Sequence, residues 1–302
     1  MTEARENKRL LSWTGERCVP WADEASVIHE HLHRYLFSRP LVEGKEVLDL
    51  GSGEGYGSQI LASSARRVAG IELDPLAVEH ARLNYRDSNL AFVEGSVLDL
   101  RQFEDGSFDA AVCFEVIEHV SDHDRLLAEV SRVLRPGGIF IVSTPDREVY
   151  NTELGHVNPY HLKEMDLQEF TTLLSSQFAH SVVWGQRAVS GSVLSRLDSA
   201  THRGVDRLPV RRENDRWSVV EPPAAKYLIA VASNDPVPQL PSDSLLFETG
   251  SAAGGEASMR ERHPWLGEAV LVGRSLIESM RRRAALVMRE RNRRREAKAD
   301  SS

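Results

Sequence analysis

The stretch VLDLGSGEGYGS, from Val47 to Ser58, decides the fold of this chain. Its first residues are apolar apart from one aspartate, as in a buried strand, and the glycines that follow allow a sharp backbone turn. A Gly-x-Gly pattern directly after a strand and before a helix is typical of βαβ units that bind nucleotides. Taken alone, the same pattern also fits a tight turn that holds no ligand.

Two acidic residues near this loop indicate what kind of ligand it holds. Glu72 ends the next apolar run, about 20 residues further on, where an acid can hold both hydroxyls of a ribose. The glycine spacing is G-x-G-x-G, whereas pyrophosphate-binding loops use G-x-G-x-x-G. Glu54 lies inside the loop and would repel an anion there. The loop therefore predicts a cationic ligand.

Short apolar runs alternate with helical patterns from about residue 45 to 143. This alternation predicts a parallel sheet with helices on both faces. Three of the helices have predicted starts: one at Asp74 with Pro75, one at Ser121, and one at Asp166 with Glu169. Two later apolar runs, 180–186 and 225–233, have no helix between them, which predicts an antiparallel pair of strands at the sheet's edge.

Three stretches carry a family resemblance: VLDLGSGEGYG, GIELD and RVLRPGGIFIVSTP. In order and spacing they are similar to the motifs of class I S-adenosylmethionine-dependent methyltransferases, over about residues 43–233. The resemblance implies an α/β fold, a Rossmann-like seven-stranded, mostly parallel sheet with helices on both faces and an antiparallel last strand. It also implies S-adenosylmethionine as the cofactor.

The same resemblance assigns the cofactor's contacts. Asp49 and the glycines would line its methionine part, Glu72 would bind the ribose, and Phe114 and Glu115 would lie beside the sulfonium. Ser96 departs from the aspartate that the family often uses near the adenine, and the amide of Val97 is the other candidate there. The full set of expected cofactor-binding residues is Asp49, Gly51, Ser52, Gly53, Gly55, Glu72, Leu73, Ser96, Val97, Phe114 and Glu115.

Three ionisable side chains follow the fourth apolar run, in the stretch EVIEH that contains Glu115, Glu118 and His119. The carboxyl ends of parallel strands hold ligands in open α/β sheets. Under one interpretation Glu118 and His119 begin the next helix and face water, as charged residues mostly do. Under the other interpretation Glu115, Glu118 and His119 bind a divalent ion, with His156 or His161 of GHVNPYH as a further ligand.

EVIEH resembles two groups of methyltransferases. These are the small-RNA 3′-terminal 2′-O-methyltransferases, which hold a divalent ion with Glu, Glu, His and a further His, and the ubiquinone-pathway O-methyltransferases. The resemblance implies Mg²⁺ or Mn²⁺ bound by Glu115, Glu118, His119 and His161. If no metal binds, Glu118, His119 and His161 stay the catalytic candidates, with a histidine as general base.

The acceptor is indicated by a second resemblance. TGERCVPW, HEHLHRYLFSRPL and NPYHLKEMDLQEF are similar to bacterial O-methyltransferases of saccharides, which often accompany enzymes of polysaccharide biosynthesis. This implies a saccharide or lipid-linked glycan acceptor and an N-terminal helix that closes over the cofactor. RNA 2′-O-methylation, methylation of a quinone precursor, and a non-enzymatic adaptor acting through the C-terminal helix stay open as alternatives.

Composition supports a soluble globular protein: of 302 residues, 41% are hydrophobic and 27% charged. Two cysteines exclude a disulfide framework or a zinc ribbon. No apolar signal segment or membrane span is evident, so the expected location is cytoplasmic. The expected organisation is an N-terminal helical arm over 1–42, a methyltransferase domain over 43–233 with an insertion at 187–223, a linker over 234–260, and a basic amphipathic helix over 261–302.

The C-terminal segment has a charge of its own. From Arg274 onward ten Lys or Arg stand against four Asp or Glu, which is +6 and leaves −14 for the rest of the net −8. An acidic body with a basic tail suggests a separate role for the tail. Its apolar stripe indicates a partner helix or the inner membrane surface, so the protein could be peripheral there. RNA is a weaker candidate partner, and a homo-oligomer stays open.

Overall fold

The computed structural model describes residues 25–155, 158–189, 210–213, 216–238, 240 and 244–246. These residues all fall within one compact unit of the chain. His156, the expected basic helix over 261–302, and most of the expected N-terminal arm and linker lie outside the described residues. Within the described residues, no helix has the length and apolar character needed to cross a membrane.

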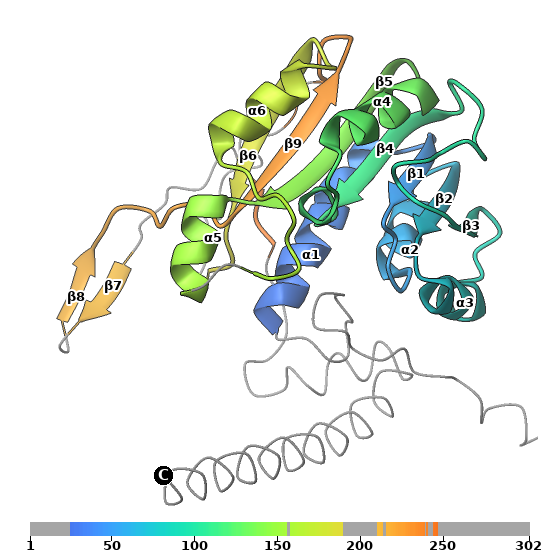
Figure 1. The fold of residues 1–302 in the computed structure, drawn as a ribbon. Helices are drawn as coiled ribbons and strands as arrows, with labels where there is room; N and C mark the ends of the chain where they lie inside the picture. Colours follow the sequence, from blue (N-terminus) through green and yellow to red (C-terminus); the bar gives the residue numbers. More distant parts are fainter. Residues whose placement is uncertain are drawn as a thin grey trace, which may run out of the picture. The chain divides into compact units, whose positions relative to one another are not determined.

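The sheet has seven strands, and the predicted fold class is confirmed (Figure 1). Its order is β3-β2-β1-β4-β5-β9-β6. The first five strands in this order pair in parallel, and β9 runs antiparallel to both of its neighbours. The bounds are β1 Glu46–Leu50, β2 Arg67–Glu72, β3 Leu90–Glu94, β4 Phe108–Phe114, β5 Leu134–Pro145, β6 His180–Gln186 and β9 Tyr227–Ser233.

The helices of the described residues connect these strands and cover the sheet. They are α1 Ala25–Ser38, α2 Tyr56–Ala62, α3 Pro75–Asn84, α4 His123–Val133, α5 Arg147–Leu154 and α6 Leu167–Ser175, with short 3₁₀ helices η1 Arg39–Leu41 and η2 Ile117–His119. Two further strands, β7 Val210–Glu213 and β8 Arg216–Val219, form an antiparallel hairpin within the predicted insertion.

The core lies on both faces of the sheet because successive strand residues point to opposite sides. Leu48 and Leu50 of β1 join the buried cluster under α4 and α6. Val47, the residue before Leu48, points to the other face and joins the cluster under α1 and α2. Asp49 lies two residues after Val47 and therefore points to the same face of the sheet. Its carboxylate is thus directed towards α1 and α2 from the middle of the sheet.

Capping side chains set the helix starts. Asp74 accepts a hydrogen bond from the amide of Leu76 ahead of Pro75, and Asp166 forms the predicted capping box with Glu169. The start of α4 differs from the prediction by one residue. Its cap is Asp122, whose side chain accepts from the amide of Arg125 at 3.0 Å, and not Ser121. Asp and Ser cap helices about equally well, so composition alone does not separate neighbours.

Candidate active site

The glycine loop after β1 is built from left-handed backbone. Gly51, Gly53 and Gly55 have φ of 70°, 56° and 105°, a region that residues with side chains rarely adopt. The Gly51 amide donates to the carbonyl of Ile71 at 2.8 Å, and the Gly53 amide donates to Glu72 Oε2 at 2.9 Å. The loop is therefore fixed against the carboxyl end of β2. Glu72 Oε1 accepts a second amide, that of Asp74.

Asp49 is fully buried beneath this loop. Its carboxylate accepts from Ser58 Oγ at 2.6 Å and lies 3.5 Å from the hydroxyl of Tyr35, which comes from α1. Burial raises the pKa of Asp49 to about 7, and the charge of Glu72 adds to that rise. A positively charged group nearby would favour the ionised carboxylate.

The structure corrects the interpretation of Glu54. Its side chain is fully buried and contacts His80 of α3 and Tyr85, the residue that follows α3. It accepts two contacts from the hydroxyl of Tyr85, at 2.7 and 2.9 Å, and lies 3.1 Å from His80 Nε2. Glu54 thus ties the glycine loop to α3, and the preference for a cationic ligand rests on Asp49 and Glu72 instead.

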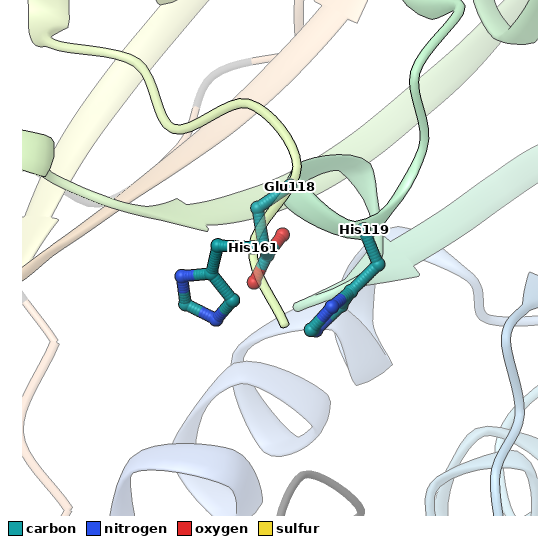
Figure 2. Close-up of side chains that lie close together, drawn as sticks. All are labelled: Glu118, His119 and His161. Atoms are coloured by element: carbon teal, nitrogen blue, oxygen red, sulfur yellow. The ribbon is translucent and has the colours of Figure 1, made fainter. Parts of the chain in front are cut away.

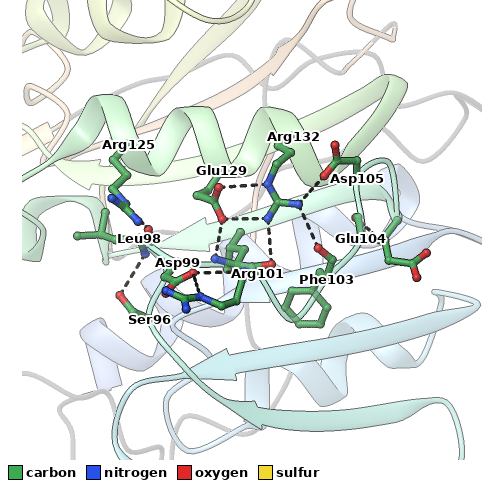
Figure 3. A network of polar contacts seen from close by, with 12 residues as sticks. Ser96, Leu98, Asp99, Arg101, Phe103, Glu104, Asp105, Arg125, Glu129 and Arg132 are labelled. Carbon is green, nitrogen blue, oxygen red and sulfur yellow. Dashed lines mark hydrogen bonds and ion pairs between the residues drawn. The ribbon is translucent and has the colours of Figure 1, made fainter.

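The loop after β3 is held by α4 (Figure 3). Arg132 donates to the carbonyls of Leu100 and Phe103, and Glu129 Oε2 accepts the amide of Leu100 at 2.6 Å. Ser96 Oγ accepts the amide of Leu98 at 3.2 Å, so this side chain shapes the loop. The other expected cofactor residues lie on the same carboxyl edge of the sheet: Leu73, 70% exposed, Val97, buried, Ser52, buried, and Phe114, buried.

Glu115 adopts an unusual backbone conformation at the end of β4. Its φ is 55°, which costs of order 1–3 kcal/mol for a residue with a side chain. Ser143 of β5 compensates by accepting the Glu115 amide at 3.2 Å and donating to Oε1 at 2.7 Å. Arg34 Nη1 lies 3.4 Å from the same oxygen. The turn aims the Glu115 carboxylate at α1 and β5.

Glu118, His119 and His161 come together beyond this turn (Figure 2). One ligand atom from each lies within 4.8 Å of the others. Glu118 and His119 come from η2, and His161 comes from the loop before α6. The amide of Leu162 donates to the Glu118 carbonyl at 2.8 Å, which fastens that loop to η2. Among the described residues this cluster does not include Glu115, whose carboxylate is engaged by Ser143 and Arg34.

The Glu118 carboxyl group is the most unusual member of the cluster. It is fully buried, and neither of its oxygens has a hydrogen-bond partner. Burial raises its pKa well above the ordinary value, and the charge of Glu115 raises it further. An isolated buried carboxylate is very unfavourable, so the group is neutral unless a cation lies beside it.

The two histidines are oriented by their surroundings. His119 Nδ1 donates to the carbonyl of Tyr160 at 3.0 Å, which leaves Nε2 as its unprotonated nitrogen in the neutral ring. His161 Nδ1 lies 2.6 Å from Glu164 Oε1, and the ring stacks on Tyr150 with centroids 5.4 Å apart. The cluster thus brings together two oriented imidazole rings and a carboxyl group whose oxygens have no hydrogen-bond partner.

Helix α1 lies beside this edge, and Arg34 fixes it there. That α1 closes over the cofactor stays a prediction. The Arg34 side chain is buried, its Nε donates to Gln186 Oε1 at 2.7 Å, and its guanidinium lies 4.4 Å from the Tyr227 ring centre. Gln186 in turn donates to the carbonyl of Glu30 at 2.9 Å. Sequence reasoning missed Arg34 because an arginine on a helix is normally solvated and Gln186 is 152 residues away.

Glu164 was also missed. It follows His161 by three residues, and this His-x-x-Glu spacing is the signal that could have identified it. Such a spacing is common on solvated turns, so it gains meaning only once both side chains are found buried together.

Comparison with known proteins gives a family match. Residues 48–142 match the family model described as a methyltransferase domain. A Mycolicibacterium smegmatis protein named "Probable S-adenosylmethionine-dependent methyltransferase" is 38% identical over 170 residues, 55% of this chain and 64% of the relative. A Mycobacterium tuberculosis protein of similar name is 36% identical over 167 residues, 55% of this chain and 60% of the relative. A Xanthomonas oryzae ubiquinone biosynthesis O-methyltransferase is 37% identical over 115 residues, 37% of this chain and 48% of the relative.

The chain thus spans less than two thirds of the length of these curated relatives. Two solved structures share its fold. A chain from the complex of the Haloferax volcanii Trm112 methyltransferase activator with its methyltransferase has a TM-score of 0.51 at 21% identity, covering 68% of this chain and 89% of its own. A methyltransferase from Archaeoglobus fulgidus has a TM-score of 0.50 at 14% identity, and the match covers 68% of this chain and 92% of that one. The family match means that residues 48–142 are similar to methyltransferase domains, and the sheet order and the two solved structures show the fold of class I S-adenosylmethionine-dependent methyltransferases.

Proposed function

We propose that this chain transfers the methyl group of S-adenosylmethionine to a hydroxyl oxygen, and that the acceptor is a saccharide. The observation that carries the proposal is the proximity of two groups of residues at one sheet edge. Asp49, the glycine loop and Glu72 form the cofactor side. Glu118, His119 and His161 form the acceptor side, directly beyond the end of β4.

The cofactor side suits a cationic ligand. Asp49, Glu72 and Glu115 place three acidic groups at neighbouring strand ends, where they attract the ammonium and sulfonium charges of S-adenosylmethionine. Each Glu72 oxygen accepts one amide in this structure, so lone pairs are left for two ribose hydroxyls. When bound, the cofactor supplies an electrophilic methyl group for in-line attack.

The acceptor side supplies a base. A sugar hydroxyl holds its proton tightly, and imidazole is the side chain best suited to take up a proton near neutral pH. His119 Nε2 is the unprotonated nitrogen in the neutral ring because Nδ1 donates to Tyr160. The role of His119 is therefore to accept the hydroxyl proton as the oxygen attacks, and His161 orients the same hydroxyl from the other side of Glu118.

The same residues fit a divalent metal ion. The buried Glu118 oxygens have no hydrogen-bond partner, and two imidazoles lie within reach of them. A set of two nitrogen ligands and one carboxylate suits Mn²⁺ at least as well as Mg²⁺. When bound, such an ion lowers the pKa of a coordinated hydroxyl. Glu118, His119 and His161 would hold it, whereas Glu115 would first have to leave Ser143 and Arg34.

A second acceptor class is favoured by one comparison. The Xanthomonas relatives are named for ubiquinone biosynthesis, so the aromatic hydroxyl of a quinone precursor is the alternative acceptor. The saccharide is preferred on the stretch NPYHLKEMDLQEF, which contains His161 and resembles saccharide methyltransferases. RNA is the third choice.

The test is a methyl-donor assay on the purified chain, after calorimetry with S-adenosylhomocysteine. Labelled donor is offered with glycan, catechol and RNA pools, with and without chelator. We expect binding in the micromolar range and transfer to the glycan pool. His119→Gln should abolish transfer, and His180→Gln, at an exposed position of β6, is the matched control. Transfer to the catechol pool alone would show that the acceptor is a quinone precursor and not a saccharide. Absence of S-adenosylhomocysteine binding would overturn the whole proposal.

A further inference from the structure

His161 is held at both ring nitrogens by buried partners. Nδ1 lies 2.6 Å from Glu164 Oε1, and Nε2 lies 3.0 Å from Asn158 Nδ2. The side chains of His161 and Glu164 are only 4% and 5% exposed, so water does not compete for these contacts. An imidazole held in this way has a defined rotation and a defined tautomer.

The amide of Asn158 shows which tautomer is present. Its Oδ1 accepts the amide of Tyr160 at 3.1 Å, and a carbonyl oxygen is required for that contact. The NH₂ end must therefore face His161 Nε2, and it can only donate. Nε2 consequently carries a lone pair, and the ring proton lies on Nδ1, facing the Glu164 carboxylate.

Glu164 is itself fixed in place. Its second oxygen, Oε2, accepts from Asn151 Nδ2 at 2.5 Å, which anchors the carboxylate to α5. Tyr150, the neighbour of Asn151 on α5, stacks on the His161 ring at an interplanar angle of 28°. Helix α5 thus sets both the rotation of the imidazole and the position of the acceptor at Nδ1.

We propose that Glu164 is a positioning residue, which holds His161 with its proton on Nδ1 and its Nε2 lone pair directed to the corner formed with Glu118 and His119. What that lone pair binds rests on the proposed function: it binds a divalent ion, or accepts a hydrogen bond from the acceptor hydroxyl and so orients it, once the Asn158 amide moves aside. A carboxylate at the far nitrogen also makes Nε2 a better electron-pair donor.

The tautomer can be measured in the full chain without cofactor, metal or acceptor. Long-range ¹H–¹⁵N spectra of chain labelled with ¹⁵N-histidine distinguish protonated from unprotonated ring nitrogens, and the His161→Gln variant assigns the signals. We expect the wild-type chain, at a pH where this ring is neutral, to show an unprotonated Nε2 and a protonated Nδ1. A protonated Nε2 in the wild-type chain would overturn the proposal by itself.

Two substitutions test whether Glu164 is the cause. Glu164→Leu removes the acceptor, so we expect the Nδ1–H tautomer to lose its dominance and Mn²⁺ affinity to fall about 10- to 100-fold. Glu164→Gln keeps an oxygen that can accept from Nδ1, so it should retain the tautomer and lose less affinity. Glu148→Leu, which removes one charge from an exposed position of α5, should change neither.

A purely structural role for Glu164 gives a different result. A Leu variant with a lowered melting temperature but the wild-type tautomer and wild-type Mn²⁺ affinity would contradict the proposal. Should the Leu variant fail to fold, the wild-type and Gln spectra decide. Failure of the proposed function is recognised separately: a wild-type chain that binds neither S-adenosylhomocysteine nor Mn²⁺ refutes that function, and the spectra still test Glu164.

Discussion

At the scale of single residues, the site contains two fully buried carboxyl groups, of which Asp49 has hydrogen-bond partners and Glu118 has none. Asp49 has a pKa raised to about 7, and Glu118 has a pKa raised well above its ordinary value. In both cases burial is the largest cause. Groups of this kind destabilise the folded chain in their ionised form and become favourable when a cation arrives, which is the pattern expected of a functional site.

Asp49→Asn is expected to change the pH dependence of stability. The unfolded chain loses this proton near pH 4 and the folded chain near pH 7, so the contribution of Asp49 to stability is fully present below pH 4 and is lost as the pH rises to 7. Asparagine stays neutral throughout. The variant should therefore gain on the wild type between pH 5 and pH 8, by up to about 4 kcal/mol in the free energy of unfolding.

Urea unfolding at both pH values measures that difference, with Asp87→Asn on the exposed surface as control. The same Asp49 variant should bind S-adenosylhomocysteine about tenfold or more weakly, because it lacks the charge that faces an ammonium group. Equal pH dependence in wild type and variant would show that the buried carboxyl group is not the cause.

Glu118→Gln is expected to separate function from stability. A protonated carboxyl group and an amide are similar in size and both neutral, so the free energy of unfolding at pH 7 should change by less than about 1 kcal/mol. Mn²⁺ binding, followed by electron paramagnetic resonance, and methyl transfer should both be lost. A variant that unfolds readily would instead assign Glu118 to the structural core.

At the scale of elements, the glycine loop depends on α3 as well as on its own glycines. The Tyr85 hydroxyl donates to Glu54, and burial together with the Glu54 charge raises the pKa of Tyr85 far above its ordinary value, so it keeps that proton. Because Glu54 lies between Gly53 and Gly55, this contact fixes the loop to the end of α3. The loop geometry therefore depends on α3 as well as on the loop's own sequence.

Tyr85→Phe is expected to leave the buried Glu54 with one donor fewer, at a cost of about 1.5–3 kcal/mol in the free energy of unfolding. The loop should become less ordered, and affinity for S-adenosylhomocysteine should fall about threefold to tenfold although Tyr85 is not proposed to touch the ligand. Thermal unfolding and calorimetry measure the two effects. Unchanged affinity beside lowered stability would restrict Tyr85 to a structural role.

Arg34→Met should loosen α1 from the sheet edge. The methionine fills part of the same space but cannot donate to Gln186 or pair with Glu115, so we expect a loss of about 2–3 kcal/mol. Hydrogen exchange of the α1 amides should rise selectively. Arg86→Met, at an exposed position after α3, is the control, and uniform exchange changes in both variants would contradict the assignment of Arg34.

At the scale of the whole molecule, the sheet order explains where the site lies. The chain moves from β1 to β2 and β3 on one side and then to β4 and β5 on the other, so the order reverses at β1. Connections leave in opposite directions from such a point, and ligands bind outside the strand ends there. The glycine loop and the turn at Glu115 are the first residues after the two strands that meet at this point.

Removal of residues 247–302 should leave S-adenosylhomocysteine affinity within about twofold, since every proposed cofactor contact lies within residues 49–115. The basic charge from Arg274 onward suggests a separate role at an anionic membrane surface, where each basic residue contributes of order 1 kcal/mol. Flotation with anionic liposomes should therefore depend on this segment. Equal flotation of the full and shortened chains would exclude that role.

The sequence by itself determined the fold class and the antiparallel position of the last strand pair, because glycine spacing and strand patterning are local properties of the chain. Its assignment of cofactor contacts stays a prediction. It also named Glu118, His119 and His161 as one group; the structure brings these three side chains together, and their roles stay predictions. Only the tertiary structure decided that Glu54 faces α3, that Glu115 pairs with Arg34, and that Glu164 supports His161. Each of these depends on burial and on partners from other elements, and whether a charged side chain is buried cannot be read from its neighbours in sequence.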